Sequence, residues 1–372
     1  MKQLLNVTIF FTGIVLFASC KEAYEPQTSE AKGNLLVIEG VLSNGGLTSI
    51  RVSRTRPLNA PIETPELRAL VSVESESNQR FILTEKDRGE YTVQVSLNPS
   101  EKYRLRVKTS KGSEYLSDFV SVKNTPPIDE ITWEKNEKGL NIYIDTHDPQ
   151  NATRYYRWGF EETWRRTVLN SNWEYVNGAF QPRKIPTHPT CYDTHIGNPL
   201  TLFSTVKLVE DVVSKARVNF IPVGSHKLAD KYSILVKQYA LEKGAYEYWE
   251  NMKKNTEQLG SIFDPQPSYM YGNIRSVSDP AEMVVGYFSA CNVTEKRIFI
   301  TAQEAKWTYS PSAQCELQEV LAADFEDTFG TGPGRLGWIP IGQIAFRPDW
   351  YAVKSIACAD CGPNFIKPVW WR

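Results

Sequence analysis

The sequence predicts a mainly β protein in which an N-terminal β-sandwich is followed by a larger β-rich domain with one amphipathic helix. Three observations support this fold class. The chain of 372 residues is long enough for two or three domains after an N-terminal export segment. Short runs of alternating apolar and polar residues recur along it. One segment departs from that pattern, because its apolar residues recur at helical spacing.

The strand pattern is clear in residues 34–124. In residues 102–108 (KYRLRVK), apolar side chains alternate with Arg and Lys, so one face of the strand is buried and the other meets solvent. Glycines in residues 43–46 (SNGG) and 87–90 (DRGE) suit tight turns between such strands. About six strands at this spacing predict a small sandwich of immunoglobulin-like or carboxypeptidase-regulatory-like type.

A pair of prolines marks the predicted domain boundary. Residues 124–129 (NTPPID) cannot continue a central strand, because proline lacks the backbone N–H that a ladder needs. We therefore assign residues 125–372 to the second domain. Its strand candidates include residues 231–239 (KYSILVKQY) and 296–301 (KRIFIT), which are rich in β-branched and aromatic side chains.

The helical segment lies near residues 241–259. Its apolar residues fall three or four apart with Glu and Lys on the other side, and Gly260 follows where a C-terminal cap belongs. The favoured interpretation packs Tyr248 and Trp249 against a sheet. The alternative exposes them, and then Tyr248, Trp249 and Phe263 are candidate interface residues, because aromatic side chains often anchor interfaces.

The first residues predict export and lipidation. Residues 1–19 have the charged, apolar and small-residue regions of a secretory signal peptide, and the apolar run is short of the ~20 residues that span a membrane. The segment ends at Cys20 and resembles a bacterial lipobox, so we expect Cys20 to be lipidated and to anchor the chain. Residues 20–33 are polar and suit a flexible tether. The alternative is a secreted protein in which Cys20 forms a disulfide.

Composition and missing motifs exclude several functions. Lys and Arg number 42 against 43 Asp and Glu, so no basic field points to nucleic acid. The sequence contains no G-x-S-x-G elbow, H-E-x-x-H, Walker loop or kinase signature. Residues 332–337 (GPGRLG) spell G-x-G-x-x-G but lack the strand before and the helix after that a dinucleotide site needs. We therefore expect neither an enzyme nor a cofactor.

The cysteines and histidines allow two local hypotheses. His188, Cys191 and His195 are weak candidates for zinc ligands, although a cysteine in an exported protein more often forms a disulfide. Cys358 and Cys361, in the sequence CADC, predict a structural disulfide, because neither a second C-x-x-C nor a redox-type helix accompanies them. Lipidation of the first of six cysteines leaves an odd number, so at least one should stay free or pair between chains.

Several stretches together resemble a known family. They are LLVIEGVLSN (35–44), YYRWGFEETW (155–164), the helix and loop of 232–267, and the closing CADCG and KPVWW. They resemble the Bacteroidota lipoprotein family catalogued as domain of unknown function 4249, over essentially the whole mature chain. The resemblance implies an outer-membrane lipoprotein that is typically encoded beside a TonB-dependent receptor and assists nutrient or iron-complex uptake. It supplies no catalytic residues.

The sequence thus predicts an outer-membrane lipoprotein that is a non-catalytic accessory or binding subunit of a TonB-dependent uptake system. Its expected partners are the membrane, the receptor and a small-molecule or glycan ligand. Lys21 and Glu22 after the lipidated cysteine partly resemble a surface-export signal, which favours the cell surface over the periplasmic face. One alternative is a surface adhesin or glycan-binding β-sandwich. Another is a zinc hydrolase built on the histidines and cysteine of residues 188–195.

Overall fold

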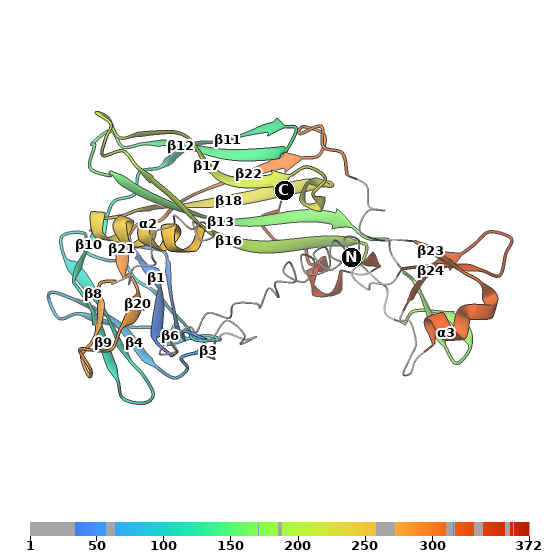
Figure 1. The fold of residues 1–372 in the computed structure, drawn as a ribbon, viewed down its shortest axis with the longest axis horizontal. Helices are drawn as coiled ribbons and strands as arrows, with labels where there is room; N and C mark the ends of the chain where they lie inside the picture. Colours follow the sequence, from blue (N-terminus) through green and yellow to red (C-terminus); the bar gives the residue numbers. More distant parts are fainter. Residues whose placement is uncertain are drawn as a thin grey trace, which may run out of the picture.

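The computed structural model describes residues 34–56, 64–169, 171–184, 188–257, 272–309, 315, 317–330, 338–353, 358–359 and 361–371. These residues form a mainly β protein, which confirms the predicted fold class. Figure 1 shows two β-sandwiches with one helix between them, and a smaller lobe at the far end of the second sandwich. The signal peptide, the lipidated tether, Phe263 and the loop 332–337 lie outside the described residues. No helix in the described ranges is long and apolar enough to cross a membrane.

The N-terminal sandwich is built from the first ten strands and from three that come much later in the chain. The first ten are β1 (Leu36–Ser43), β2 (Leu47–Arg54), β3 (Thr64–Pro65), β4 (Leu70–Ser75), β5 (Arg80–Ile82), β6 (Thr84–Glu85), β7 (Glu90–Gln94), β8 (Lys102–Lys108), β9 (Glu114–Ser117) and β10 (Val120–Lys123). The later three are β19 (Ile274–Ser276), β20 (Val284–Gly286) and β21 (Ser289–Cys291). Aliphatic side chains and three buried tyrosines fill its core, as the alternation in residues 102–108 predicts.

The late strands correct the predicted division at residue 125. β20 and β21 pair in parallel with β1, and β21 also pairs in parallel with β10, while β19 pairs with β9. Figure 1 shows these orange strands among the blue and teal strands of the N-terminal sandwich. Parallel neighbours need long crossover connections. The partners of β1 therefore come from far along the chain, and local sequence patterns do not reveal them.

The second sandwich packs a three-stranded sheet on a four-stranded sheet. The first sheet has the order β11 (Ile128–Asn136), β12 (Gly139–His147) and β17 (Val212–Pro222). The second has the order β16 (Thr190–Ser204), β13 (Tyr155–Thr167), β18 (Lys231–Ala240) and β22 (Thr294–Thr301). A single 3-10 turn, η1 (His226–Leu228), connects β17 to β18. Inward side chains of both sheets, such as Ile142 and Trp158, form one hydrophobic core.

The predicted helix is confirmed as α2 (Lys243–Glu257). Its apolar face is buried: Tyr248 is 4% exposed and Trp249 is 7% exposed. These rings pack with Tyr287, from the segment that joins β20 to β21, and with side chains of β16. The hypothesis that Tyr248 and Trp249 form an exposed interface is therefore wrong, because the helix uses them to pack between the two sandwiches.

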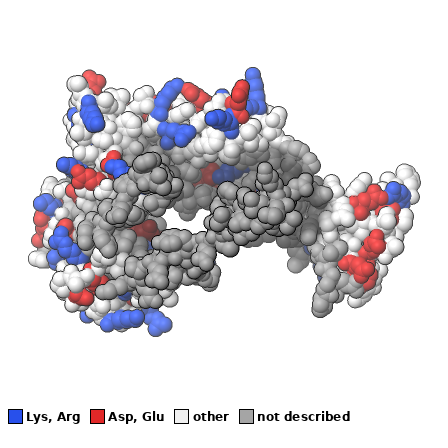
Figure 2. Space-filling view, viewed as in Figure 1, with Lys and Arg blue, Asp and Glu red and all other residues white. Residues whose placement is uncertain are grey.

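A small lobe at the far end was not foreseen. It combines the hairpin β14 (Trp173–Val176) and β15 (Ala179–Pro182) with the sheet β23 (Gln318–Val320), β25 (Trp350–Val353) and β24 (Ile339–Gln343). Two short helical turns, η3 (Ala322–Asp324) and α3 (Phe325–Phe329), complete it. Its core is largely aromatic, with Phe180 stacked on Trp350. Acidic side chains gather on the face of the lobe seen in Figure 2.

Candidate functional site

A large cavity lies at the end of the second sandwich that faces the lobe. Its walls come from the end of β13 and the start of β16, from η1, from the start of β18 and the end of β22, and from the C-terminal segment that contains Cys358 and Asn364. Its volume is about 1520 Å³, which exceeds the ~300–1,000 Å³ of a typical small-molecule pocket. The cavity is the candidate site because it brings together charged, aromatic and histidine side chains from distant parts of the sequence.

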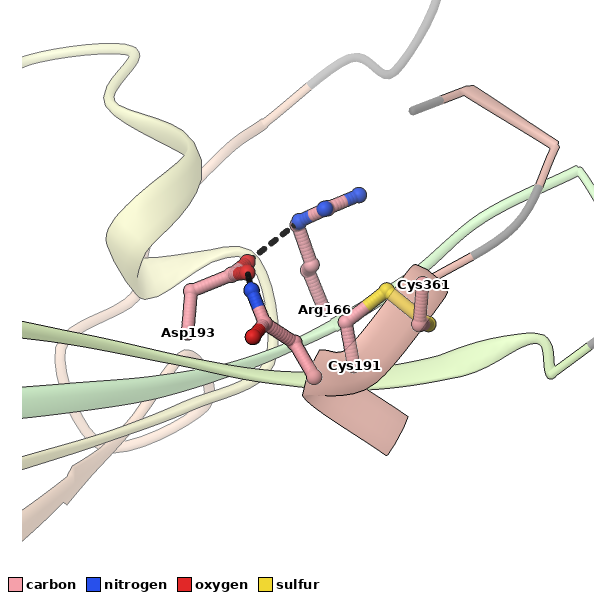
Figure 3. Close-up of a disulfide and its surroundings, with 5 residues drawn as sticks. Arg166, Cys191, Asp193 and Cys361 are labelled. Atoms are coloured by element: carbon pink, nitrogen blue, oxygen red, sulfur yellow. Dashed lines mark hydrogen bonds and ion pairs between the residues drawn. A yellow bond between two sulfur atoms is a disulfide. The ribbon is translucent and has the colours of Figure 1, made fainter. Parts of the chain in front are cut away.

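Two disulfides close this end of the molecule. Cys191 on β16 bonds Cys361, and Cys315 bonds Cys358. Figure 3 shows the first bond between β16 and the 3-10 turn η5 (Gly362–Phe365). The predicted disulfide between Cys358 and Cys361 is wrong. The Leu169 N–H donates to the Cys358 carbonyl at 2.8 Å, which holds this segment beside the end of β13, where each thiol meets a different distant partner.

The odd cysteine is Cys291. It is free and fully buried on β21, so the prediction that at least one thiol stays free or pairs between chains is confirmed within this chain. Burial raises the pKa of its thiol to about 11. A thiol that is buried and protonated at neutral pH is chemically inert. Cys291 is therefore a structural cysteine.

The candidate zinc site is not assembled. The sulfur of Cys191 is committed to a disulfide, and the ring of His188 stacks on Phe365 with 3.7 Å between centroids. His195 lies further along β16 and bonds a carboxylate instead. The described residues contain no group of three or more metal-ligating side chains that could hold an ion.

That carboxylate belongs to Glu162, which is buried on the inner face of β13. Each of its oxygens accepts two hydrogen bonds. Oε1 accepts from His195 Nδ1 at 3.0 Å and from the ammonium group of Lys227. Oε2 accepts from the Tyr232 hydroxyl at 2.9 Å and from Asn219 Nδ2 at 3.3 Å. A buried charge is tolerated only when it is paired and hydrogen-bonded in this way.

The network fixes how His195 faces the cavity. A carboxylate accepts only, so the Nδ1 atom of His195 carries the proton of their shared hydrogen bond. The other ring nitrogen, Nε2, belongs to a side chain that lines the cavity and is 58% exposed. The hydroxyl of Tyr232 stays protonated because burial and the adjacent Glu162 raise its pKa well above the usual value.

Two Arg–Asp pairs line the cavity beside this network. Arg165 forms a two-point ion pair with Asp230, with a distance of 2.8 Å from Nη2 of Arg165 to Oδ1 of Asp230. Arg166 binds Asp193, whose second oxygen accepts from Asn364 Nδ2 at 2.8 Å. Figure 3 shows the side chains of Asp193 and Arg166 pointing toward one another beside the disulfide. The C-terminal segment is thus joined to β16 by a hydrogen bond as well as by a disulfide.

The Trp164 ring in the cavity wall already contacts two neighbouring side chains. The Trp164 ring meets the edge of His226 at 5.6 Å and the Lys227 ammonium at 5.0 Å. Burial, and next the charge of Arg166, lower the pKa of His226, so its ring is neutral at neutral pH. The indole N–H of Trp164 is buried and has no hydrogen-bond partner in the described part of the chain.

Apart from His195, which the sequence analysis named as a candidate zinc ligand, the residues of the polar network were not singled out from the sequence. The stretch YYRWGFEETW contained a usable signal, because Glu162 occupies an inward position between Phe160 and Trp164. A charged residue at an apolar position of a strand marks a buried ion pair or a site. Lys227 and Asn219 come from elements that no local pattern connects to β13.

The chain belongs to a family of proteins of unknown function. Its sequence matches the family described as "Domain of unknown function (DUF4249)" over residues 21–297, which is most of the chain. No curated protein matches the sequence.

Two solved structures show a distant likeness. The first is a two fibronectin type-III domain segment from chicken tenascin, with 11% identity and a TM-score of 0.18, covering 56% of this chain and 92% of that chain. The second is a putative membrane anchored protein from Corynebacterium diphtheriae, with 12% identity and a TM-score of 0.16, covering 56% of this chain and 55% of that chain. Neither likeness carries a functional argument.

Proposed function

We propose that this protein is an outer-membrane lipoprotein, anchored through Cys20, that acts as a non-catalytic binding subunit of a TonB-dependent uptake system for a nutrient or an iron complex. The observation that carries the proposal is the large cavity at the end of the second sandwich where two disulfides hold the chain. Disulfides form and persist in exported proteins, which agrees with the signal peptide predicted at residues 1–19. The family resemblance supports the TonB-dependent partner.

The carboxylates of the cavity favour binding over catalysis. A carboxylate that acts as a general base must be able to reach a substrate proton. The oxygens of Glu162 already accept four hydrogen bonds, and the cavity carboxylates Asp193 and Asp230 are each bound by an arginine. Groups paired in this way hold a shape and a charge pattern, which is what a binding subunit requires.

The two alternative functions gain less support. A glycan-binding face would carry a row of exposed aromatic rings on one sheet. The described exposed rings come from separate elements, such as Phe119 in the N-terminal sandwich, Phe220 on β17 and Tyr351 in the lobe. The zinc hydrolase fails because its proposed ligand Cys191 is in a disulfide.

A pull-down from native membranes tests the proposal. A C-terminally tagged chain, extracted in mild detergent, should recover a TonB-dependent receptor in stoichiometric amount. The variant Cys20→Ala is the matched control, and it should lose palmitate labelling, membrane association and the receptor together. Recovery of the lipoprotein without any receptor would contradict the transporter assignment. Protease treatment of intact cells then reports whether the chain faces the cell exterior, as we propose.

A further inference from the structure

We propose that the cavity at the disulfide-linked end of the second sandwich binds a small molecule that carries two or more carboxylate or phosphate groups. The biological meaning of such a ligand rests on the function proposed above. The site itself is argued from its own charges, donors and ring contacts, without reference to a transporter.

The charge of the lining favours an anion. Among the described residues of the lining, the cationic side chains are Arg165, Arg166 and Lys231, and the carboxylates are those of Asp193 and Asp230. The described lining therefore has more positive than negative side chains, while the whole chain has a net charge of −1. A concave surface of one sign focuses the electrostatic field and attracts ligands of the opposite sign.

Hydrogen-bond donors add to this preference. Nδ1 of His195 is bonded to Glu162, so Nε2 is the ring nitrogen that is left for a ligand in the cavity. An imidazole that carries a proton on both nitrogens donates from Nε2 as well as from Nδ1, and hydrogen bonds between ionised partners are the stronger ones.

Two buried indole N–H groups near the cavity also lack an acceptor in the described structure. One belongs to Trp164 in the wall, and the other to Trp371, whose ring lies 5.4 Å from that of the lining residue Tyr192. A buried donor without an acceptor destabilises the structure. A ligand rich in acceptor oxygens reduces that destabilisation wherever it reaches such a group, whereas an apolar ligand leaves it in place.

The ring contacts argue against a neutral sugar. Sugars bind proteins by stacking on open aromatic faces as well as by hydrogen bonds. The Trp164 ring is occupied by His226 and Lys227, and the Tyr192 ring by Trp371. The described polar groups of the wall, by contrast, include two arginines, a lysine and His195, and the cavity has room for a molecule with several anionic groups.

Calorimetric titration of the full mature chain carrying Cys20→Ala tests the inference. Citrate supplies carboxylates, pyrophosphate supplies phosphates, and maltotriose is the neutral probe. We expect saturable binding of at least one anion, weakened by added salt, and no binding of maltotriose. His195→Gln and Lys231→Gln should each weaken the binding by about tenfold or more, since each removes a charge-assisted contact.

Two matched variants serve as controls. In His147→Gln, the lost ring also bonds a carboxylate through Nδ1, that of Asp129 at 2.7 Å, but it lies on β12 outside the cavity lining. In Lys237→Gln, the lost ammonium lies on β18, like that of Lys231, but pairs with Glu295 at 3.6 Å away from the cavity. Both controls should bind the anion as the parent chain does.

The titration results identify which kind of ligand the cavity binds. Tighter binding of citrate identifies carboxylates as the ligand groups, and tighter binding of pyrophosphate identifies phosphates. Binding of neither anion, binding of maltotriose instead, or equal losses in the control variants would overturn the inference. The titration needs no receptor and the pull-down needs no ligand, so failure of one proposal is distinguishable from failure of the other.

Discussion

The two sandwiches differ in the side chains at the inward positions of their strands. In the N-terminal sandwich, β8 turns Tyr103, Leu105 and Val107 inward, and all three pack in an apolar core. In the second sandwich, β13 turns Glu162 inward beside Trp164. A buried ion pair is often no more stable than apolar side chains of similar size. The inward face of β8 therefore serves apolar packing, whereas that of β13 keeps a buried charge at the end of the second sandwich.

The largest expected effect comes from breaking the buried network. Glu162→Ala leaves Lys227 and three further donors without their acceptor, so the free energy of unfolding should fall by about 3–5 kcal/mol. The neighbouring Glu161→Ala removes a carboxylate on the opposite face that is paired with Arg297 at 3.4 Å, and it should cost about 0–1 kcal/mol. Urea unfolding of the two variants compares them. Equal losses would show that the network is not a distinct feature of the second sandwich.

Removal of each disulfide should lower the free energy of unfolding by a different amount. Cys191 and Cys361 are separated by 170 residues, against 43 for Cys315 and Cys358. Closing the longer loop removes more entropy from the unfolded chain, so its removal by a double serine variant should cost about 1 kcal/mol more than removal of the shorter one. Unfolding of the two double variants in urea measures this. The reverse order would indicate that local contacts of the C-terminal segment decide the stability.

A substitution at the junction between the two sandwiches should change the free energy of unfolding by a smaller amount. The guanidinium carbon of Arg157 lies 4.8 Å from the Tyr239 ring and 4.6 Å from the Trp249 ring, and its buried Nε has no hydrogen-bond partner among the described residues. Arg157→Met loses two cation–π contacts but removes a buried charge. We expect a change in unfolding free energy of less than about 1 kcal/mol. A loss of several kcal/mol would show that this cation has a partner that holds it strongly.

The smallest effect at neutral pH concerns Cys291. Because burial raises its pKa to about 11, while an unfolded thiol titrates near pH ~8.5, the unfolded state loses this proton first as the pH rises. The stability contribution of the protonated thiol is therefore complete below pH ~8.5 and declines between there and the folded pKa. Cys291→Ala should abolish this part of the alkaline decline. At pH 8, iodoacetamide should label the unreduced chain only after unfolding, and rapid labelling of the native chain would contradict the burial.

The sequence predicts the parts of this fold that depend on near neighbours. Alternation in residues 102–108 and the helical spacing near 241–259 are local patterns, and both are confirmed. The parallel pairing of β20 with β1 and the partner of Cys361 depend on contacts between distant residues. A single sequence does not encode them in any short pattern. The site was missed for the same reason, because the donors to Glu162 come from four separate elements.

The most direct test of this account is a magnetic resonance titration of the mature Cys20→Ala chain with citrate and with pyrophosphate, observed through labelled histidine side chains. The chain contains four histidines. The account predicts that at least one of the two anions shifts the ring signals of His195 and His226, which line the cavity, and leaves those of His147 unchanged. Unchanged signals from His195 and His226 with both anions, or an equal shift of His147, would contradict the central claim that the disulfide-linked end of the second sandwich is the binding site.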